Sequence, residues 1–586
     1  MANKFAIKPK KLSMNNTLIR SNIIPAIWLI PALIFGVMLY RLRLGVDFTD
    51  ESFYVAMAYN FYHGSQPFVD EINLVQISAW IVTPLIYLYG EFAPNFDGLI
   101  LFMRDCYWLF LLLIAVVVYR SLDNIVNDRR LAVLMALTCA SFVPFNIFAL
   151  SYNTLGMGCF ALGAFLLARG WLCKPTAIRS VLAGVAHAVA GLSYPSIVMP
   201  LILIYPLLFW YYKKDWKQIF FYGGAASVVV LGVLMPMTYA AGWDRVAYSF
   251  SYTRSFGYQN LSNMTGLFSG FIRHGYVVLL WGALFIWLRD KSVISAKLLI
   301  IFFPLIWLLV GGAGMPHANW YVVNYGMAAP LVFLLIRNKG VLPEKLLIYI
   351  WLPALLVGLN CAWSSGNAAI AAANGLIVGC AVTSWMLASL YKQVDRANIS
   401  EVDKQYGYLY APLIFVVVLV CFQFSSVYRD APVSQLNHKA VDGPYGGIIT
   451  TQDKVNFAEQ ISQDIASVST NVSNGGLLAL NDFPAAYLFS KLPAATNTAW
   501  FFSSDVPRNN TAREDLVKRF QVQHDYPSII IKLIMMPYDA NGWRSYRGEP
   551  NDKLNALASS SMYKPTVLRN EYEIYVLNPT KIEQLK

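Results

Sequence analysis

Apolar runs of roughly 20 residues recur along the first 426 positions of the chain, and short polar segments separate them. A helix needs about 20 apolar residues to cross the hydrocarbon core of a bilayer. The pattern therefore predicts a polytopic α-helical membrane protein with about 13 spanning helices. The predicted spans are 23–40, 103–120, 131–147, 154–169, 179–193, 196–212, 218–239, 276–289, 297–312, 320–336, 345–362, 369–391 and 408–426.

The pattern changes after position 426, where polar residues appear regularly and apolar runs become short. Segments 476–480, 528–532 and 572–577 are rich in residues that favour strands, and a helical pattern covers 453–466. Strands that alternate with helices are typical of an α/β domain. The chain therefore divides into a basic tail (1–22), a transmembrane module (23–426) and a C-terminal α/β domain (427–586).

Composition agrees with the membrane assignment, because 57% of the residues are hydrophobic and only 13% are charged, whereas soluble domains carry about 25% charged residues. The net charge of +12 comes from Lys and Arg in the short loops between spans. This is the positive-inside pattern, and it argues against a nucleic-acid partner. It places the N-terminal tail in the cytoplasm and, by the parity of the spans, the C-terminal domain outside.

Two longer segments are predicted on the outer side, 44–100 and 240–275. Between Leu44 and Met103 there are seven acidic residues and no Lys or Arg. Within this segment Phe53–Tyr62 and Leu74–Tyr89 are amphipathic, so we expect two helices that lie at the outer membrane interface.

Three carboxylates, Asp47, Asp50 and Glu51, follow the first predicted span directly. Low dielectric near a membrane raises the basicity of a carboxylate, and the start of a helix favours negative charge. These residues are therefore candidates for a catalytic base. The alternative is a solvated acidic loop that serves topology alone.

Candidate cations lie at other outer positions. Arg104 beside Asp105 either contacts a substrate or forms a structural ion pair. Arg254 and Arg273 belong to the second outer segment, where Arg binds a substrate phosphate or lipid headgroups. His317 and Asn319 precede a predicted span and provide further polar contacts.

Three uncharged candidates complete the set. Tyr152 and Asn153 occupy a short outer loop, where Asn153 either contacts a substrate or caps the helix predicted to begin at Thr154. Tyr194 lies in the predicted outward hairpin at 193–195 and either faces a cavity or serves packing.

Three motifs of the first outer segment, Thr49-Asp-Glu-Ser-Phe-Tyr54, His63-Gly64 and Trp80-Ile-Val-Thr-Pro-Leu85, resemble the GT-C superfamily. These are polyprenyl-phosphate-sugar glycosyltransferases, including bacterial relatives of the protein O-mannosyltransferases and of the lipid A aminoarabinose transferase. Two departures stand out. Many relatives carry a second acid where this chain has Asn153, and Val82-Thr-Pro-Leu85 replaces the Lys-Pro-Pro-Leu of the aminoarabinose transferase.

The resemblance implies transfer of a sugar from an undecaprenyl-phosphate carrier to an envelope acceptor, with inversion, on the periplasmic face of a bacterial inner membrane. The acceptor would be lipopolysaccharide, O-antigen or another surface glycan, lipid A, or a protein. Asp50 would be the base, Glu51 a supporting or acceptor-binding residue, and Asp47 the reserve base. The carrier phosphate would meet cations, with Arg254 and His317 as the first candidates.

Other assignments stay open. The chain has no metal-binding motif, although Asp50 and Glu51 could hold a divalent cation. A transporter or flippase of a lipid-linked sugar would show inverted repeats and charges within the spans. A glycan polymerase is a further alternative, but it gives no special reason for the C-terminal α/β domain.

Overall fold

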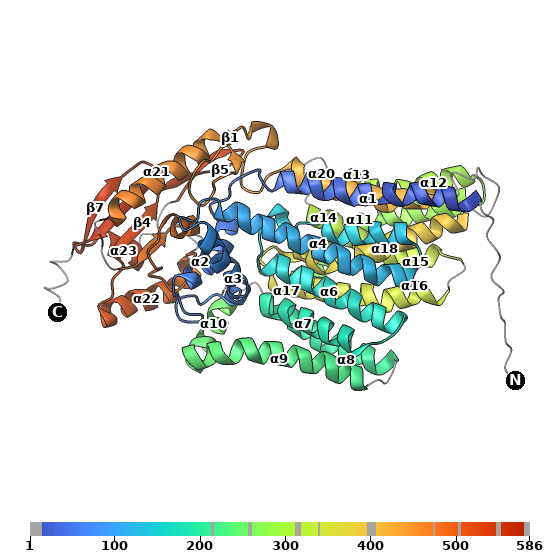
Figure 1. Cartoon of the computed structure of the whole chain (residues 1–586), viewed down its shortest axis with the longest axis horizontal. Coiled ribbons are helices and arrows are strands. Elements are labelled where there is room, and N and C mark those ends of the chain that lie inside the picture. The colour runs from blue at the N-terminus through green and yellow to red at the C-terminus, as the bar shows by residue number, and fades with distance from the viewer. Residues whose placement is uncertain are drawn as a thin grey trace.

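The computed structural model describes residues 15–212, 216–255, 261–310, 318–337, 340–394, 406–470, 472, 475–501, 506–546 and 552–578. A bundle of roughly parallel and antiparallel helices forms one end of an elongated molecule, and strands with covering helices form the other (Figure 1). Helix α1 begins at the end of the bundle that is remote from the C-terminal region. Helices α2 (Asp50–Tyr62) and α3 (Gln76–Phe92) lie between the two parts.

The bundle consists of apolar helices that pack mainly side by side (Figure 1). They are α1 (Asn15–Arg41), α4 (Leu99–Val126), α5 (Arg129–Ala140), α6 (Tyr152–Leu172), α7 (Ala177–Ser193), α8 (Val198–Tyr212), α9 (Trp216–Ala241), α10 (Trp243–Ser255), α11 (Leu261–Arg289), α12 (Val293–Ile301), α13 (Phe303–Val310), α14 (Ala318–Met327), α15 (Ala329–Leu335), α16 (Val341–Leu346), α17 (Leu352–Ser364), α18 (Ala373–Val394) and α20 (Tyr410–Ser425).

Within the described residues, eight helical stretches are long and apolar enough to cross a membrane, and three shorter helices are also apolar. This is the construction of a polytopic helical membrane protein. Each predicted span overlaps a helix, but some are interrupted: 297–312 breaks at Phe302, between α12 and α13. The number of 13 spans therefore stays a prediction.

The two helices expected at the membrane interface are present, but their surroundings differ from each other. Helix α2 is buried from Glu51 to Phe61, because it packs between the bundle and the C-terminal region. Helix α3 exposes large apolar side chains, among them Trp80, Tyr87 and Phe92, as an interfacial helix would. The first helix is therefore covered by protein and not exposed on one face as expected, and its position relative to the membrane stays a prediction.

The second predicted outer segment, 240–275, differs from expectation because it is mostly helical. Helix α10 occupies its first half, and α11 begins at Leu261 and continues for 29 residues to Arg289. The apolar pattern at 276–289 marked only the second half of this long helix. Arg273 therefore lies inside α11 and not in a loop.

The C-terminal region contains a mixed four-stranded sheet of order β3-β4-β8-β7, where β3 (Leu477–Leu480) and β4 (Ile529–Leu533) are parallel. The other neighbours, β4 with β8 (Tyr572–Leu577) and β8 with β7 (Tyr563–Leu568), are antiparallel. The predicted strand segments thus form β3, β4 and β8. The remaining elements are β1 (His438–Lys439), β2 (Ile449–Thr450), α21 (Gln452–Ser469), α22 (Val506–Gln523), the hairpin of β5 (Met535–Asp539) and β6 (Gly542–Ser545), and α23 (Lys553–Ala558).

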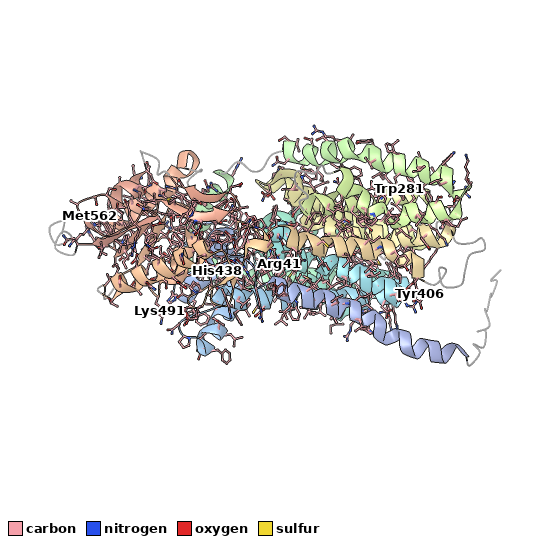
Figure 2. All side chains as sticks on the ribbon, turned by 90° about the horizontal axis from the view of Figure 1, so that it is seen from above. Arg41, Trp281, Tyr406, His438, Lys491 and Met562 are labelled. Carbon is pink, nitrogen blue, oxygen red and sulfur yellow. The ribbon has the colours of Figure 1, made fainter. Side chains whose placement is uncertain are left out.

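The loop after α1 joins the two parts of the molecule. The Gly45 N–H donates to the Ile449 carbonyl at 2.8 Å, and the Val46 N–H donates to Asp430 Oδ2 at 2.7 Å. Figure 2 shows Arg41, at the end of α1, on the boundary between helical bundle and C-terminal region. Gly45 has a φ of 86°, and a Cβ there would lie 2.0 Å from Val427 Cγ1.

We expect Gly45→Ala to lower the free energy of unfolding by about 3 kcal/mol, because it adds backbone strain and a steric clash. Gly64→Ala is the matched control, since Gly64 also has a positive φ of 96° but has nothing within 4 Å of the added Cβ. Thermal unfolding of the purified protein in detergent measures both variants. Equal losses of stability would contradict the close approach at Gly45.

Candidate active site

Asp47 organises the start of α2. Its Oδ1 accepts from the Thr49 N–H at 2.9 Å and from the Thr49 hydroxyl, and its Oδ2 accepts from the Glu51 N–H at 2.9 Å. Both oxygens of this buried carboxylate are therefore engaged by the chain that follows it, as at a capped helix terminus. Asp47, the reserve base of the sequence prediction, thus has a structural role.

Glu51 points away from the cavity described below and pairs with Arg104 of α4. Arg104 Nε lies 2.6 Å from Glu51 Oε1 and Nη2 lies 2.5 Å from Oε2, with both side chains 5% exposed or less. Arg104 also donates to the Leu42 carbonyl at 2.6 Å and the Gly45 carbonyl at 2.8 Å. Arg104 therefore forms the structural ion pair that the sequence suggested. Its partner is Glu51, in the first turn of α2, and not the neighbouring Asp105.

Asp50 points in a different direction from Glu51, towards the cavity described below. Its carboxylate accepts from the Tyr428 hydroxyl at 2.8 Å and lies 2.6 Å from Arg429 Nη1. The side chain keeps 19% of its surface exposed. Burial raises the pKa of Asp50 to about 6, although the positive charge of Arg429 acts to lower it. A carboxyl group with this pKa is a competent base near neutral pH.

Arg429 is the cation nearest to this carboxylate, and it follows α20 closely. It donates to the Thr49 hydroxyl, and its guanidinium carbon lies 5.0 Å from the Tyr428 ring centroid and 5.2 Å from that of Tyr538. Its backbone has a φ of 49°, in the left-handed region, which costs a non-glycine residue about 1–3 kcal/mol. Arg429 was not among the residues predicted for the site, although a cation directly after the last predicted span was a signal in the sequence.

Asp50 lines a cavity of about 550 Å³ where α2, α10 and α17 approach the C-terminal region. Among the described residues that line it, Asp50 alone carries a charge. The rest of the lining is aromatic, neutral and polar, or aliphatic (Leu74, Val75 and Pro195), and the aromatic and polar part suits sugar rings and hydroxyl groups. It includes Phe53, Tyr54, Tyr152, Tyr194, Phe250, Trp363, Trp500, Asn73, Thr253, Ser196, Ser364, Ser365 and Asn367.

Tyr152 and Tyr194 are brought together at one wall of this cavity. The ring centroids of Tyr54 and Tyr152 lie 5.7 Å apart, and those of Tyr152 and Tyr194 lie 5.3 Å apart. Tyr54 follows Asp50 by one turn of α2, so the row of rings begins beside the carboxylate.

Asn153 and Asn319 are occupied by other contacts. Asn153 Oδ1 accepts from Asn374 Nδ2 at 2.9 Å, which joins α6 to α18. Helix α6 begins one residue before Asn153 and is capped by Ser151, so the capping role considered for Asn153 belongs to Ser151. Asn319 Oδ1 accepts from the Phe145 N–H at 3.0 Å. Neither residue lines the cavity.

The remaining predicted cations lie outside the immediate site. Arg254 is exposed on α10, next to Thr253, which does line the cavity. Arg273 is exposed on α11. His317 lies outside the described residues. Among the residues that the structure describes, no group of three His, Cys, Asp or Glu side chains is placed to hold a metal ion.

The C-terminal region contributes a wall that sequence reasoning did not find. The Trp500 ring lies 5.3 Å from Phe53 and lines the cavity, and its Nε1 donates to Asp482 Oδ1 at 2.8 Å. The Arg429 guanidinium carbon is 5.9 Å from the same ring. No local motif marks Trp500, because its neighbours in space come from α2 and from the end of α20.

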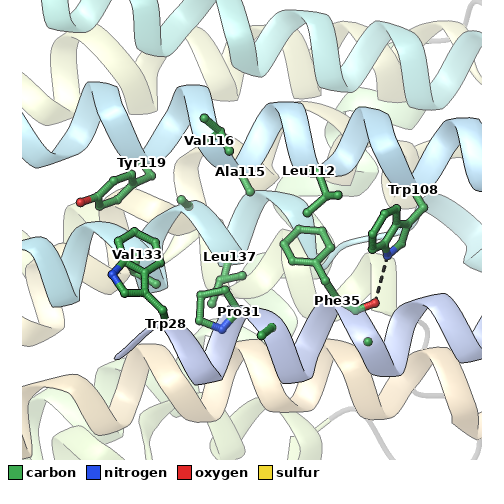
Figure 3. Close-up of a pocket in the computed structure, with 13 residues that line it drawn as sticks. Trp28, Pro31, Phe35, Trp108, Leu112, Ala115, Val116, Tyr119, Val133 and Leu137 are labelled. Atoms are coloured by element: carbon green, nitrogen blue, oxygen red, sulfur yellow. Dashed lines mark hydrogen bonds between the residues drawn. The ribbon is translucent and has the colours of Figure 1, made fainter. Parts of the chain in front are cut away.

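A second cavity, of about 420 Å³, lies between α1, α4 and α5 (Figure 3). It is lined by apolar and aromatic side chains, and the Trp108 Nε1 donates to the Phe35 carbonyl at 3.0 Å. No carboxylate or cation is among the described residues that line it. It therefore has no group for acid–base chemistry and is separate from the site around Asp50.

Comparison with known proteins gives structural similarities at low sequence identity. No protein-family model and no curated protein sequence matches the chain. ArnT from Cupriavidus metallidurans bound to undecaprenyl phosphate is 11% identical, with a TM-score of 0.47 over 96% of this chain and 99% of that one. The same protein in the apo state is 11% identical, with a TM-score of 0.39 over 95% and 98%.

The oligosaccharyltransferase of Archaeoglobus fulgidus, in complex with zinc and sulfate, is 12% identical, with a TM-score of 0.41. The match covers 84% of this chain and 64% of that one. At these identities and TM-scores the similarity assigns no role to any residue.

Arg104→Gln should lower the free energy of unfolding by about 3–5 kcal/mol, because it leaves Glu51 buried without its ion-pair partner. Arg43→Gln removes the same charge from an exposed position in the loop after α1, which Arg104 contacts, and serves as the control. Thermal unfolding in detergent measures both. An Arg104→Gln protein as stable as the control would contradict the structural role of the pair.

Proposed function

We propose that this protein is a membrane glycosyltransferase of the GT-C type that takes a sugar from an undecaprenyl-phosphate carrier. The observation that carries the proposal is the position of Asp50, whose pKa is raised to about 6, as the one charged group among the described residues lining a cavity rich in aromatic and neutral polar side chains. The motifs around Asp50 and the apolar bundle support it. The acceptor is an envelope glycan such as lipopolysaccharide or O-antigen, lipid A, or a protein.

The proposed reaction uses the Asp50 carboxylate as the base and the polyprenyl phosphate of the donor as the leaving group. Asp50 accepts the proton of an acceptor hydroxyl, whose oxygen forms a bond to the anomeric carbon of the sugar. The bond from that carbon to the phosphate oxygen breaks, and the polyprenyl phosphate leaves with the electron pair. A single displacement of this kind inverts the anomeric centre, and it needs no strong general acid because phosphate is a stable anion.

Inversion also assigns sides to the two substrates. The incoming hydroxyl and the leaving phosphate lie on opposite faces of the sugar, so the phosphate binds away from Asp50. Figure 1 shows α10 and strand β5 on opposite sides of α2. We therefore place the donor phosphate towards α10, where Arg254 follows the cavity-lining Thr253, and the acceptor towards Asp50, Arg429 and the C-terminal region. Arg273 and His317 stay further candidates for the phosphate.

The proposed orientation puts the C-terminal region in the periplasm and the N-terminus in the cytoplasm of a bacterial inner membrane. The support is the distribution of Lys and Arg among the loops. Mass spectrometry of lipopolysaccharide and lipid A from a strain that lacks the protein would identify the donor sugar and the acceptor.

Asp50→Asn should lower the transfer rate by about 10²–10⁴-fold, because the amide cannot accept the proton. Purified protein is incubated with polyprenyl-phosphate sugars and an envelope extract, and release of the carrier phosphate is measured. Glu91→Gln, which changes an exposed acid in the last turn of α3, is the control. Equal activity of wild type and Asp50→Asn would refute the assignment, and movement of sugar across vesicles without transfer would favour a flippase.

The rate should fall as the pH drops below about 6, because protonated Asp50 cannot act as a base. Arg429→Gln removes the positive charge that lowers the pKa of Asp50. The midpoint of the acidic limb should therefore move to higher pH in this variant. A profile of rate against pH for both proteins measures the shift, and a midpoint that stays in place or moves to lower pH would contradict the interaction.

A further inference from the structure

One face of the hairpin formed by β5 and β6 carries an exposed arginine between two tyrosines. Side chains two residues apart in a strand share a face, so Arg544 and Tyr546 lie together. Met536 is the partner of Arg544 in the ladder, and the ladder is irregular between Pro537 and Asp539, so Tyr538 is placed on this face by its contact with Arg544. The Arg544 guanidinium carbon lies 4.8 Å from the Tyr538 ring centroid and 5.3 Å from that of Tyr546.

This face is continuous with the base. The Arg429 guanidinium carbon lies 5.2 Å from the ring of Tyr538, the ring that Arg544 also contacts. Arg429 Nη1 in turn lies 2.6 Å from the Asp50 carboxylate. A continuous series of contacts therefore leads from the exposed Arg544 through Tyr538 and Arg429 to Asp50.

Two side chains on this face could bind an anion, because each has a polar group that is not used by the residues that the structure describes. Arg544 is exposed, and within the described residues it has no carboxylate partner. Tyr546 is 6% exposed, yet its buried hydroxyl has no hydrogen-bond partner in the described part of the chain. A buried polar atom without a partner is costly, and a ligand that accepts a hydrogen bond would satisfy it.

The acidic groups around this face are mostly engaged. Asp50 pairs with Arg429, Asp47 accepts from Thr49 and the Glu51 N–H, and Asp482 accepts from Trp500. Within the described residues, Arg544 forms no ion pair with any of these acids. Its planar guanidinium suits the two oxygens of a phosphate or carboxylate.

We propose that Arg544 and Tyr546 bind an anionic group, phosphate or carboxylate, that the acceptor carries close to its reacting hydroxyl. The inference rests on the proposed function, because inversion places the acceptor on the side of Asp50 and Arg429 and the donor phosphate on the opposite side. The ligand class is thus an anionic glycan or glycolipid, and a neutral acceptor would leave Tyr546 without a partner.

Pyrophosphate is the probe for the site, since it presents phosphate oxygens without a sugar or a lipid. Full-length protein in nanodiscs is titrated by calorimetry. Arg544→Gln should weaken pyrophosphate binding about tenfold, as loss of a charge-assisted hydrogen bond does, and Tyr546→Phe about threefold. Arg544→Lys should lie between Arg544→Gln and wild type. Arg569→Gln, which removes an exposed arginine elsewhere in the C-terminal region, should leave binding unchanged.

A second titration uses undecaprenyl phosphate with the same variants. Unchanged affinity in Arg544→Gln supports an acceptor site, whereas a parallel loss would assign the site to the donor and overturn the proposal. Pyrophosphate that does not bind, or that binds wild type and Arg544→Gln equally, would overturn it as well. Neither titration requires turnover, so failure here is distinguishable from failure of the proposed transfer reaction.

Discussion

The buried ion pair of Glu51 and Arg104 is the interaction on which the rest of the site depends. Removal of two charges from water is costly, and the cost is offset only when each charged group is fully satisfied. Arg104 meets this condition with Glu51 and with the carbonyls of Leu42 and Gly45. One side chain of α4 thereby holds the end of α1, the connecting loop and the first turn of α2.

The three neighbouring carboxylates have different roles because of this arrangement. Asp47 accepts a hydrogen bond from the Glu51 N–H in the first turn of α2. The Glu51 side chain pairs with Arg104 of the bundle. Successive positions of a helix point about 100° apart, so Asp50 faces away from Glu51 and towards the cavity. Of the three, Asp50 alone keeps a partly exposed carboxylate beside that cavity, and for this reason its raised pKa is of chemical use.

The C-terminal region belongs to the site and does not merely cover it. Trp500 lines the cavity from this side, and Arg429, where the chain leaves α20, contacts Asp50. The strained backbone of Arg429 is held by contacts from α2 and from the β5–β6 hairpin. We infer that the geometry of Asp50 depends on correct packing of the two parts of the molecule against each other.

Much of this architecture was predictable from local sequence. Apolar runs mark helices because only long apolar helices suit a bilayer, and three of the four strands of the main sheet were expected. Strand β7 was missed because most of its side chains are exposed, so its pattern resembles a loop. The interruptions of helices and the start of α11 were not predicted. An apolar run indicates that a segment is buried in lipid or protein, but it does not show where a helix begins or breaks.

The sequence by itself determined that the chain is built for a membrane and that three acids cluster after the first apolar helix, and the resemblance of the loop motifs predicted Asp50 as the base among them. The tertiary structure alone decided which acid meets which cation. Glu51 and Arg104 are 53 positions apart, and Asp50 and Tyr428 are 378 apart. Pairing over such separations leaves no local pattern, because it depends on how helices pack and on which charges burial forces to find a partner.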